Sequence, residues 1–295
     1  MTGSIAIIDA TGHDAETPLE TEVAGLGLLE RTLRLADVSE CGRALVVARS
    51  EQRERVERLV DVFHEDDRWD LQVEVREGTE ASSFAVGPEA LGADREAVLF
   101  LDSTYVYQRG MVQECLGRAL ERGGIWRARV DSTETVPLVA SDHRGWSRLA
   151  EEARAASVAP IDLVCGSDAQ PRSLQVRTLR AGDGWAEKVD SEESAQGAAE
   201  RIWQACYKSV DGPISRHLNR PMSLAISRRL APTSVRPNHM SAVTFAIGIG
   251  SALAAAVGGF WWFVLAGLLY QVTSILDGVD GELARGKYEF SLTGS

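Results

Sequence analysis

The run MSAVTFAIGIGSALAAAVGGFWWFVLAGLLYQVTSIL, residues 240–276, contains 37 residues and no charged side chain. As one helix it would be about 55 Å long, whereas about 30 Å is enough to cross the hydrocarbon core of a bilayer. Gly258 and Gly259 lie near its middle and offer a turn. The run therefore predicts two antiparallel membrane spans, at residues 241–257 and 260–276. The alternative is a helical hairpin buried in a soluble core, in which neither helix would need a polar face.

The segment before this run, residues 201–239, is basic. It contains seven Lys and Arg residues against one acid, Asp211. Such an excess beside a first span is typical of the cytoplasmic side of a membrane. Apolar residues recur between the basic ones at roughly helical spacing, which predicts an amphipathic helix on the anionic leaflet. These apolar residues are Ile214, Leu218, Met222, Leu224, Ala225 and Leu230.

Charge divides the chain into two populations. Residues 1–200 hold 22 basic and 38 acidic residues, a balance of -16, and residues 201–295 hold 9 and 5, a balance of +4, which together give -12. The acidic part would repel phosphates, so nucleic acid is excluded as a partner.

The four cysteines have no CxxC spacing, which favours a reducing cytoplasm over a zinc site or disulfides. The N-terminus has no basic region before an apolar run, so no signal peptide is expected.

Residues 1–200 alternate strand-like and helix-like patterns, which predicts a mainly parallel α/β sheet covered on both faces. Ligands of such sheets bind beyond the carboxyl ends of the strands. Asp102 ends one strand there and is a candidate metal or ribose ligand, with a turn or helix cap as the equal alternative. The predicted strands are residues 4–9, 44–48, 71–75 and 97–102, and the predicted helices are residues 27–36, 51–63 and 110–121.

Three stretches of this region, GLGLLERTLRLA (25–36), LVVAR (45–49) and FLDSTYVY (100–107), resemble sugar nucleotidyltransferases. In those enzymes the first loop is rich in glycine and basic residues. Here the loop DATGHDAETPLETE (9–22) has one glycine, no Lys or Arg and five acids. A triphosphate needs backbone N–H donors and cations, which this loop does not offer. We therefore expect a degenerate nucleotidyltransferase-like, Rossmann-like domain with weak or no catalysis.

The second predicted span continues into DGVDGELAR, residues 277–285. Asp277 and Asp280 are three residues apart and share a face of a helix. Two carboxylates at a membrane edge are costly unless a cation neutralises them, and hard oxygen ligands select Mg²⁺ or Mn²⁺. Arg285 has the planar fork that suits a phosphate. The alternative is a C-terminal helix turn whose acids are solvated, which the helix dipole disfavours.

The same residues, followed after eight positions by Gly294, match the motif DxxDGxxARx8GxxxDxxxD as far as the chain extends. In this motif the chain resembles the CDP-alcohol phosphotransferase family. With LNRPMSLAISRRLAPTSVRPNHMS (218–241) ahead of the first span, it is similar to the inositol-phosphate branch, whose members fuse a cytidylyltransferase domain to a membrane transferase.

The resemblance implies a reaction in which an acceptor hydroxyl attacks the β-phosphorus of a CDP-linked donor, such as CDP-inositol, and releases CMP. The acceptor would be an inositol phosphate or a lipid hydroxyl. It also implies a homodimer and a multi-pass protein of the cell (inner) membrane, with the N-terminal domain in the cytoplasm. By the same resemblance, Asp277 and Asp280 would ligate the metal, Gly281, Ala284, Arg285 and Asn238 would contact CDP, and Gly294 would open the next helix. A helix N-cap is the alternative for Asn238.

The third and fourth aspartates of the motif would fall after Ser295, and the resemblance makes the fourth the general base. We therefore expect the 1–295 chain not to catalyse transfer alone. The predicted organisation is a nucleotidyltransferase-like domain at residues 1–200, a linker with the amphipathic helix at 201–239, and the start of an all-α membrane domain at 240–295. Two other functions stay open: a membrane-tethered scaffold, and an active N-terminal domain that makes the CDP donor.

Overall fold

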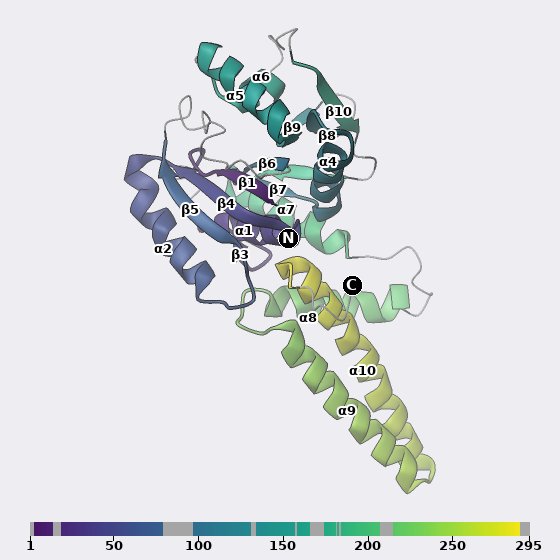
Figure 1. Ribbon diagram of the computed structural model, residues 1–295. Coiled ribbons are helices and arrows are strands. Elements are labelled where there is room, and N and C mark those ends of the chain that lie inside the picture. The colour runs from purple at the N-terminus through teal and green to yellow at the C-terminus, as the bar shows by residue number, and fades with distance from the viewer. Residues whose placement is uncertain are drawn as a thin grey trace. The chain divides into compact units, whose positions relative to one another are not determined.

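The computed structural model describes residues 3–13, 19–78, 97–130, 134–156, 158–165, 174–180, 182, 184–206 and 215–289. The chain divides into two compact units (Figure 1). The first unit contains residues 1–21 and 27–195. The second contains residues 22–26 and 196–295.

The first unit is built on a seven-stranded sheet with the order β10-β8-β9-β6-β1-β4-β5. Strand β9 pairs antiparallel with its neighbours β6 and β8, and all other neighbours in the sheet are parallel. These strands are β1 (Ser4–Asp9), β4 (Cys41–Ala48), β5 (Gln72–Glu77), β6 (Ala97–Asp102), β8 (Ile125–Val130), β9 (Glu134–Asp142) and β10 (Val176–Arg180). The first unit also has a small sheet of β7 (Tyr105–Tyr107) with β11 (Ala186–Lys188). A second small sheet, β2 (Glu22–Val23) with β3 (Leu26–Gly27), falls in the segment 22–26 of the second unit and ends at its boundary with the first.

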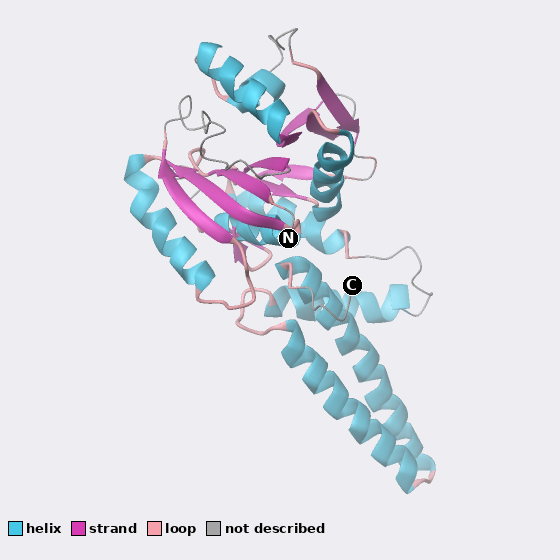
Figure 2. Ribbon diagram, in the orientation of Figure 1, coloured by secondary structure: helices cyan, strands magenta, loops and turns pink. Residues whose placement is uncertain are grey.

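Helices cover both faces of the central strands (Figure 2). Five consecutive residues of β1 and five of β6 are buried, and side chains alternate between faces along a strand, so both faces are covered. On one face, Trp146 and Leu149 pack with Ile7 and Phe100. The helices of this unit are α1 (Leu28–Val38), the 3-10 turn η1 (Ser50–Gln52), α2 (Arg53–His64), α4 (Arg109–Arg122), α5 (His143–Ala156) and α6 (Pro160–Cys165); α7 (Glu192–Gln204) contains the boundary between the two units.

The predicted mainly parallel α/β sheet is confirmed. Strands 4–9 and 97–102 have the predicted bounds, and the other predicted elements shift by a few residues at their ends. The four cysteines are free, as their spacing predicted. Burial raises the pKa of the Cys41 and Cys115 thiols to about 12.

The second unit is helical. It contains the π-helical segment η2 (Ser215–Asn219), α8 (Arg220–Leu230), α9 (Pro237–Val257) and α10 (Phe260–Lys287). Helices α9 and α10 run antiparallel side by side and turn at Gly258 and Gly259, both of which have positive φ (Figure 1). The Ser251 hydroxyl donates to the Ala266 carbonyl at 2.8 Å across the pair.

Helices α9 and α10 are long and apolar enough to cross a membrane. Only 11% of the most apolar stretch of α9 and 17% of that of α10 is buried. This exposure disagrees with a hairpin inside a soluble core, where both helices would be covered. Phe245, Leu253 and Phe263 are among the large exposed apolar side chains.

Two details of this unit bear on the sequence predictions. Helix α10 continues past the end of the predicted span at Leu276 to Lys287, so the two aspartates lie inside a helix as expected, and the alternative of a last helix turn is not what the structure has. In α8, Leu224 is buried together with Arg220, Ser223 and Ser227, so the covered face of this helix is mainly polar. Ile214, Asp211 and Gly294 lie outside the described residues.

Candidate functional site

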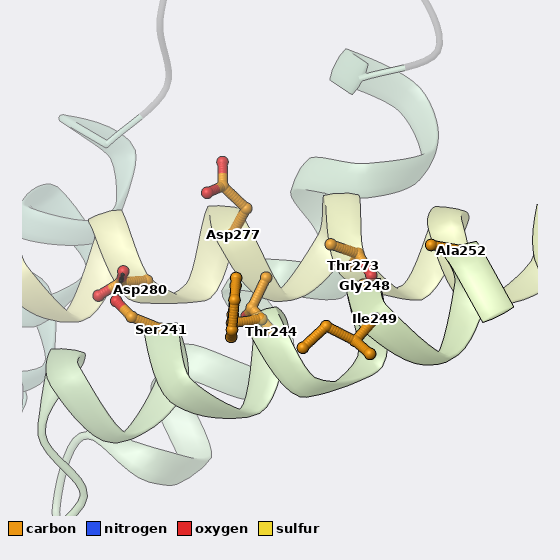
Figure 3. A pocket seen from close by; sticks show the side chains of 9 residues that line it. Ser241, Thr244, Gly248, Ile249, Ala252, Thr273, Asp277 and Asp280 are labelled. Atoms are coloured by element: carbon orange, nitrogen blue, oxygen red, sulfur yellow. Dashed lines mark hydrogen bonds between the residues drawn. The ribbon is translucent and has the colours of Figure 1, made fainter.

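Asp277 and Asp280 project from one side of α10. The helix continues through them because Gly278 and Gly281 are the only weak helix formers in DGVDGELAR, and flanking residues pack against α8 and α9. Figure 3 shows the Asp280 carboxylate beside Ser241 of α9, whereas the Asp277 carboxylate, about one turn along α10, points away from α9. Both residues line the same groove, as their spacing predicted.

An open groove of about 460 Å³ lies between α9 and α10. Asp277 and Asp280 line its polar end together with Ser241, whereas apolar and small side chains line the rest. The remaining lining residues are Thr244, Phe245, Gly248, Ile249, Ala252 and Thr273 (Figure 3).

The two aspartates differ in their partners. The Ser241 hydroxyl donates to Asp280 Oδ2 at 2.5 Å, which orients that carboxylate. Asp277 is exposed and makes no hydrogen bond or ion pair within the described part of the chain. Sequence reasoning missed Ser241. The sequence feature that could have revealed Ser241 is a hydroxyl residue near the start of α9. In an antiparallel pair of helices this position lies opposite the aspartates of α10.

The other residues that the resemblance assigned to CDP do not line this groove. The Arg285 guanidinium lies over Gly281, 3.6 Å from the position that a Cβ would take there, so this glycine leaves room for it. Ala284 is half-buried on the next turn. Asn238 is exposed and is the second residue of α9, after Pro237, so it is not the helix N-cap; Arg236 occupies that position.

Asp102 ends β6 as predicted, directly beside Asp9 at the end of β1. Its Oδ1 accepts hydrogen bonds from the Thr104 backbone N–H at 2.8 Å and hydroxyl at 2.7 Å. This is the turn alternative that the sequence left open for Asp102. Burial raises its pKa, and the hydrogen bonds from Thr104 and the nearby His13 lower it in part.

The chemistry of the side chains around the α10 pair is compatible with a divalent cation. A carboxylate without a partner, a second carboxylate three residues away and a hydroxyl form a hard oxygen set, which suits Mg²⁺ or Mn²⁺. Within the residues that the structure describes, no three His, Cys, Asp or Glu side chains gather closely enough to hold a metal ion by themselves. The remaining coordination would come from substrate phosphates and water, as is common for Mg²⁺.

The fold of the first unit is that of a nucleotidyltransferase. The 4-diphosphocytidyl-2C-methyl-D-erythritol synthase of Anaerococcus prevotii superposes with a TM-score of 0.52, at 19% identity, over 68% of this chain and 98% of that one. At this identity the likeness concerns the fold alone. No protein-family profile matches the chain.

Sequence comparison identifies the relatives of the whole chain. The bifunctional IPC transferase and DIPP synthase of Thermococcus kodakarensis is 31% identical over 299 aligned positions, which cover 92% of this chain and 66% of that protein. The Archaeoglobus fulgidus protein of the same name is 43% identical over 114 positions, or 38% of this chain and 22% of that protein. The chain is therefore a homologue of the bifunctional IPC transferase and DIPP synthases, which are transferases, and it spans about two thirds of the Thermococcus protein.

Proposed function

We propose that the protein is a membrane-embedded, metal-dependent CDP-alcohol phosphotransferase. The observation that carries this proposal is the exposed Asp277 carboxylate. It lacks a protein partner in the described structure and shares a groove with Asp280. Two acids that serve only stability rarely lie together at an apolar groove, because the repulsion between the carboxylates and the loss of their hydration are unfavourable.

The groove residues have separate roles in this proposal. Asp277 and Asp280 hold the cation, and Ser241 fixes the rotamer of Asp280 through its hydrogen bond. The bound cation supplies charge neutralisation at the diphosphate of the CDP-linked donor. Arg285, next to Gly281, offers a planar donor to a phosphate that approaches the same helix.

In the transfer, the acceptor oxygen forms a bond to the β-phosphorus of the donor. The bond from that phosphorus to the bridging oxygen breaks, CMP leaves, and the acceptor hydroxyl loses its proton. The protein's contribution is to position the two substrates in line and to stabilise charge that develops on the phosphate oxygens. The resemblance of the sequence motif to the inositol-phosphate branch of the family favours an inositol phosphate as the acceptor and CDP-inositol as the donor.

A bilayer is the proposed surrounding of α9 and α10, because their apolar side chains face outward. Helix α8 supports the same placement. Its covered face is polar, whereas Leu218 just before it and Met222 are 49% and 46% exposed, and Arg228 and Arg229 follow. An outward apolar strip next to basic residues suits an anionic cytoplasmic leaflet. The acidic α/β unit would then lie in the cytoplasm.

The test is CMP release from CDP-inositol by the full-length protein in membranes, with Mg²⁺ and an inositol phosphate present. Asp280→Asn is expected to lower the rate at least about a hundredfold, because it removes a ligand charge from the metal site. Asp102→Asn, in the other unit, is the matched control and should leave this rate unchanged. Unchanged CMP release with Asp280→Asn would instead favour a scaffolding role.

A second candidate function is synthesis of the CDP donor by the α/β unit. The fold likeness to a diphosphocytidyl synthase and the bifunctional name of the relatives favour it. The acidic loop at residues 9–22 and the commitment of Asp102 to Thr104 disfavour it. Calorimetric titration with CTP and Mg²⁺ separates the two: binding that Asp102→Asn abolishes would support synthesis, and no heat of binding would support a degenerate domain.

A further inference from the structure

Helix α10 presents two polar stripes on different faces. The groove stripe contains Thr273, Asp277 and Asp280, all of which line the groove with α9. The anchor stripe contains Gln271, Ser274, Gly278 and Glu282, which recur at i, i+3, i+7 and i+11. At about 100° per residue the two stripes are roughly a third of a turn apart. Whatever fixes the anchor stripe therefore also fixes the direction in which the aspartates point.

The first half of the anchor stripe binds the segment before α8. The Asn219 side-chain amide donates from Nδ2 to Ser274 Oγ at 3.0 Å. The Gln271 amide donates from Nε2 to Asn219 Oδ1 at 2.6 Å. Asn219 thus joins two positions of α10 that are three residues apart.

The second half of the stripe packs directly on α8. A Cβ at Gly278 would lie 3.1 Å from both Cβ and Oγ of Ser223, so any other residue there would push the two helices apart by a few tenths of an ångström. One turn later lies Glu282, whose side chain is 0% exposed. Glu282 Oε1 accepts from Arg220 Nη1 at 3.1 Å and from the Ser223 hydroxyl at 2.7 Å. Its Oε2 accepts from the Ser227 hydroxyl at 2.7 Å.

A buried carboxylate with this many donors has one favourable position. If α10 rotated, Glu282 would lose the charge and hydroxyls that compensate its burial, and Arg220, itself buried, would lose its counter-ion. Gly278 also opposes a shift of α10 along its axis, because Ser274 and Glu282, one turn before and one turn after it on that face, both carry a Cβ. No step of the proposed reaction uses either residue.

We propose that Glu282 and Gly278 are positioning residues that fix the rotation of α10 about its axis, so that Asp277 and Asp280 face the groove. This inference rests on the proposed function of those aspartates. In this inference α8 fixes the rotation of α10, the proposed metal-binding helix, in addition to any contact that α8 makes with the bilayer.

The rotation can be measured without metal or substrate. Ser241→Cys and Asp280→Cys place two thiols where a hydrogen bond now joins α9 and α10, and a short bifunctional thiosulfonate should link them in the detergent-solubilised protein. Mass spectrometry of the digested product distinguishes this link from one to the native Cys206. Adding Gly278→Ala is expected to lower the yield several-fold. Gly267→Ala, on the same helix with open space around it, should not change the yield.

Two further variants keep this test decisive. Ser223→Gly removes both atoms that a Cβ at residue 278 would meet, but also one hydroxyl donor to Glu282, so it should restore the yield in part in the Gly278→Ala background. Glu282→Gln keeps the size of the side chain but removes the charge facing Arg220, and it should also lower the yield. A yield that stays at the parent level with Gly278→Ala and with Glu282→Gln would overturn the inference. Absence of any link in the parent pair would do the same.

Binding of Mn²⁺, followed by the loss of its free electron paramagnetic resonance signal, separates the inference from the proposed function. Gly278→Ala is expected to weaken binding about tenfold, and Ser223→Gly to restore it in part. If wild type binds Mn²⁺ and Gly278→Ala binds it equally well, the positioning role is wrong and the metal site stands. If wild type binds no Mn²⁺, the proposed function loses its metal, and the cross-linking yields alone decide on the positioning role.

Discussion

The carboxyl edge of the sheet and the groove face of α10 each present two aspartates, but they use them differently. At the sheet edge, Asp9 and Asp102 each accept two hydrogen bonds from a threonine two residues later, at 2.7 and 2.8 Å. On α10, Asp280 has one hydroxyl donor and Asp277 has none in the described structure. A loop lets a following threonine fold back onto the carboxylate, whereas a helix directs it outward. The local backbone geometry therefore gives Asp9 and Asp102 hydrogen-bond donors from the same loop. It leaves the Asp277 and Asp280 pair available to a ligand.

Arg220→Ala has the largest expected effect on stability. It tests Glu282, an acid of the helical unit that, like Asp9 and Asp102, already has hydrogen-bond donors within the protein. It would leave Glu282 buried without its ion-pair partner, which we expect to lower the free energy of unfolding by about 3–5 kcal/mol. Chemical denaturation in detergent, followed by circular dichroism, measures this change. Arg229→Ala is the control, because that side chain is exposed and, among the described residues, bonds to the Ala225 carbonyl of its own helix. A cost no larger than that of the control would show that Glu282 does not need Arg220.

Tyr107→Phe tests how rigidly the sheet edge is held. The buried Tyr107 hydroxyl donates to the Pro137 carbonyl at 3.0 Å and accepts from the Asp102 backbone N–H at 3.1 Å. Its loss leaves both groups unsatisfied, and we expect a cost of about 1–3 kcal/mol in the free energy of unfolding of the α/β unit. Burial also raises the pKa of Tyr107 well above its usual range, so its phenol should be the last to ionise in an alkaline absorbance titration.

Thr104→Val removes the hydroxyl that commits Asp102 and keeps the shape of the side chain. The backbone N–H of residue 104 can still donate, so we expect a loss of only about 1 kcal/mol. Thr104→Ser keeps the hydroxyl and serves as the control in the same denaturation experiment. If both variants cost equally little, the hydroxyl is not what holds the Asp102 carboxylate.

The smallest expected effect is that of pH on the buried thiols of the α/β unit. Burial raises the pKa of Cys41, Cys115 and Cys165 to about 12, from 9.0 in the unfolded chain. Because the folded pKa is the higher one, these thiols leave stability unchanged below about pH 9 and reduce it as the pH rises from there to about 12. Iodoacetamide should therefore label the fully buried Cys41 and Cys115 only after denaturation at pH 8. Rapid labelling of the native protein at pH 8 would contradict their burial.

The sequence predicted the features that depend on continuous apolar runs. Strands 4–9 and 97–102 were predicted with the correct bounds, because a strand buried on both faces is apolar throughout. The edge strand β10, VRTLR, has only two apolar residues, three positions apart, and was not predicted. Nor were β8 and β9, which pair as an antiparallel hairpin of strands that follow each other in the sequence, with an irregular register between Arg127 and Arg129.

The same distinction applies to the candidate site. The spacing of Asp277 and Asp280 predicted their common face, since three residues on a helix bring side chains to one side. Ser241 and Glu282 were missed, because their partners lie 39 and 62 residues away in the sequence. The polar face of α8 was a usable signal: Arg220, Ser223 and Ser227 recur at i, i+3 and i+7 and need a buried partner.

The central claim is that the α10 pair is the one available to a divalent cation. Mn²⁺ titration of the detergent-solubilised protein, followed by electron paramagnetic resonance, tests it most directly. Wild type and Asp102→Asn should bind with the same affinity, and Asp277→Asn should bind at least about tenfold more weakly, because it removes the uncommitted carboxylate. Equal affinity of Asp277→Asn and wild type, or loss of binding with Asp102→Asn alone, would contradict the account.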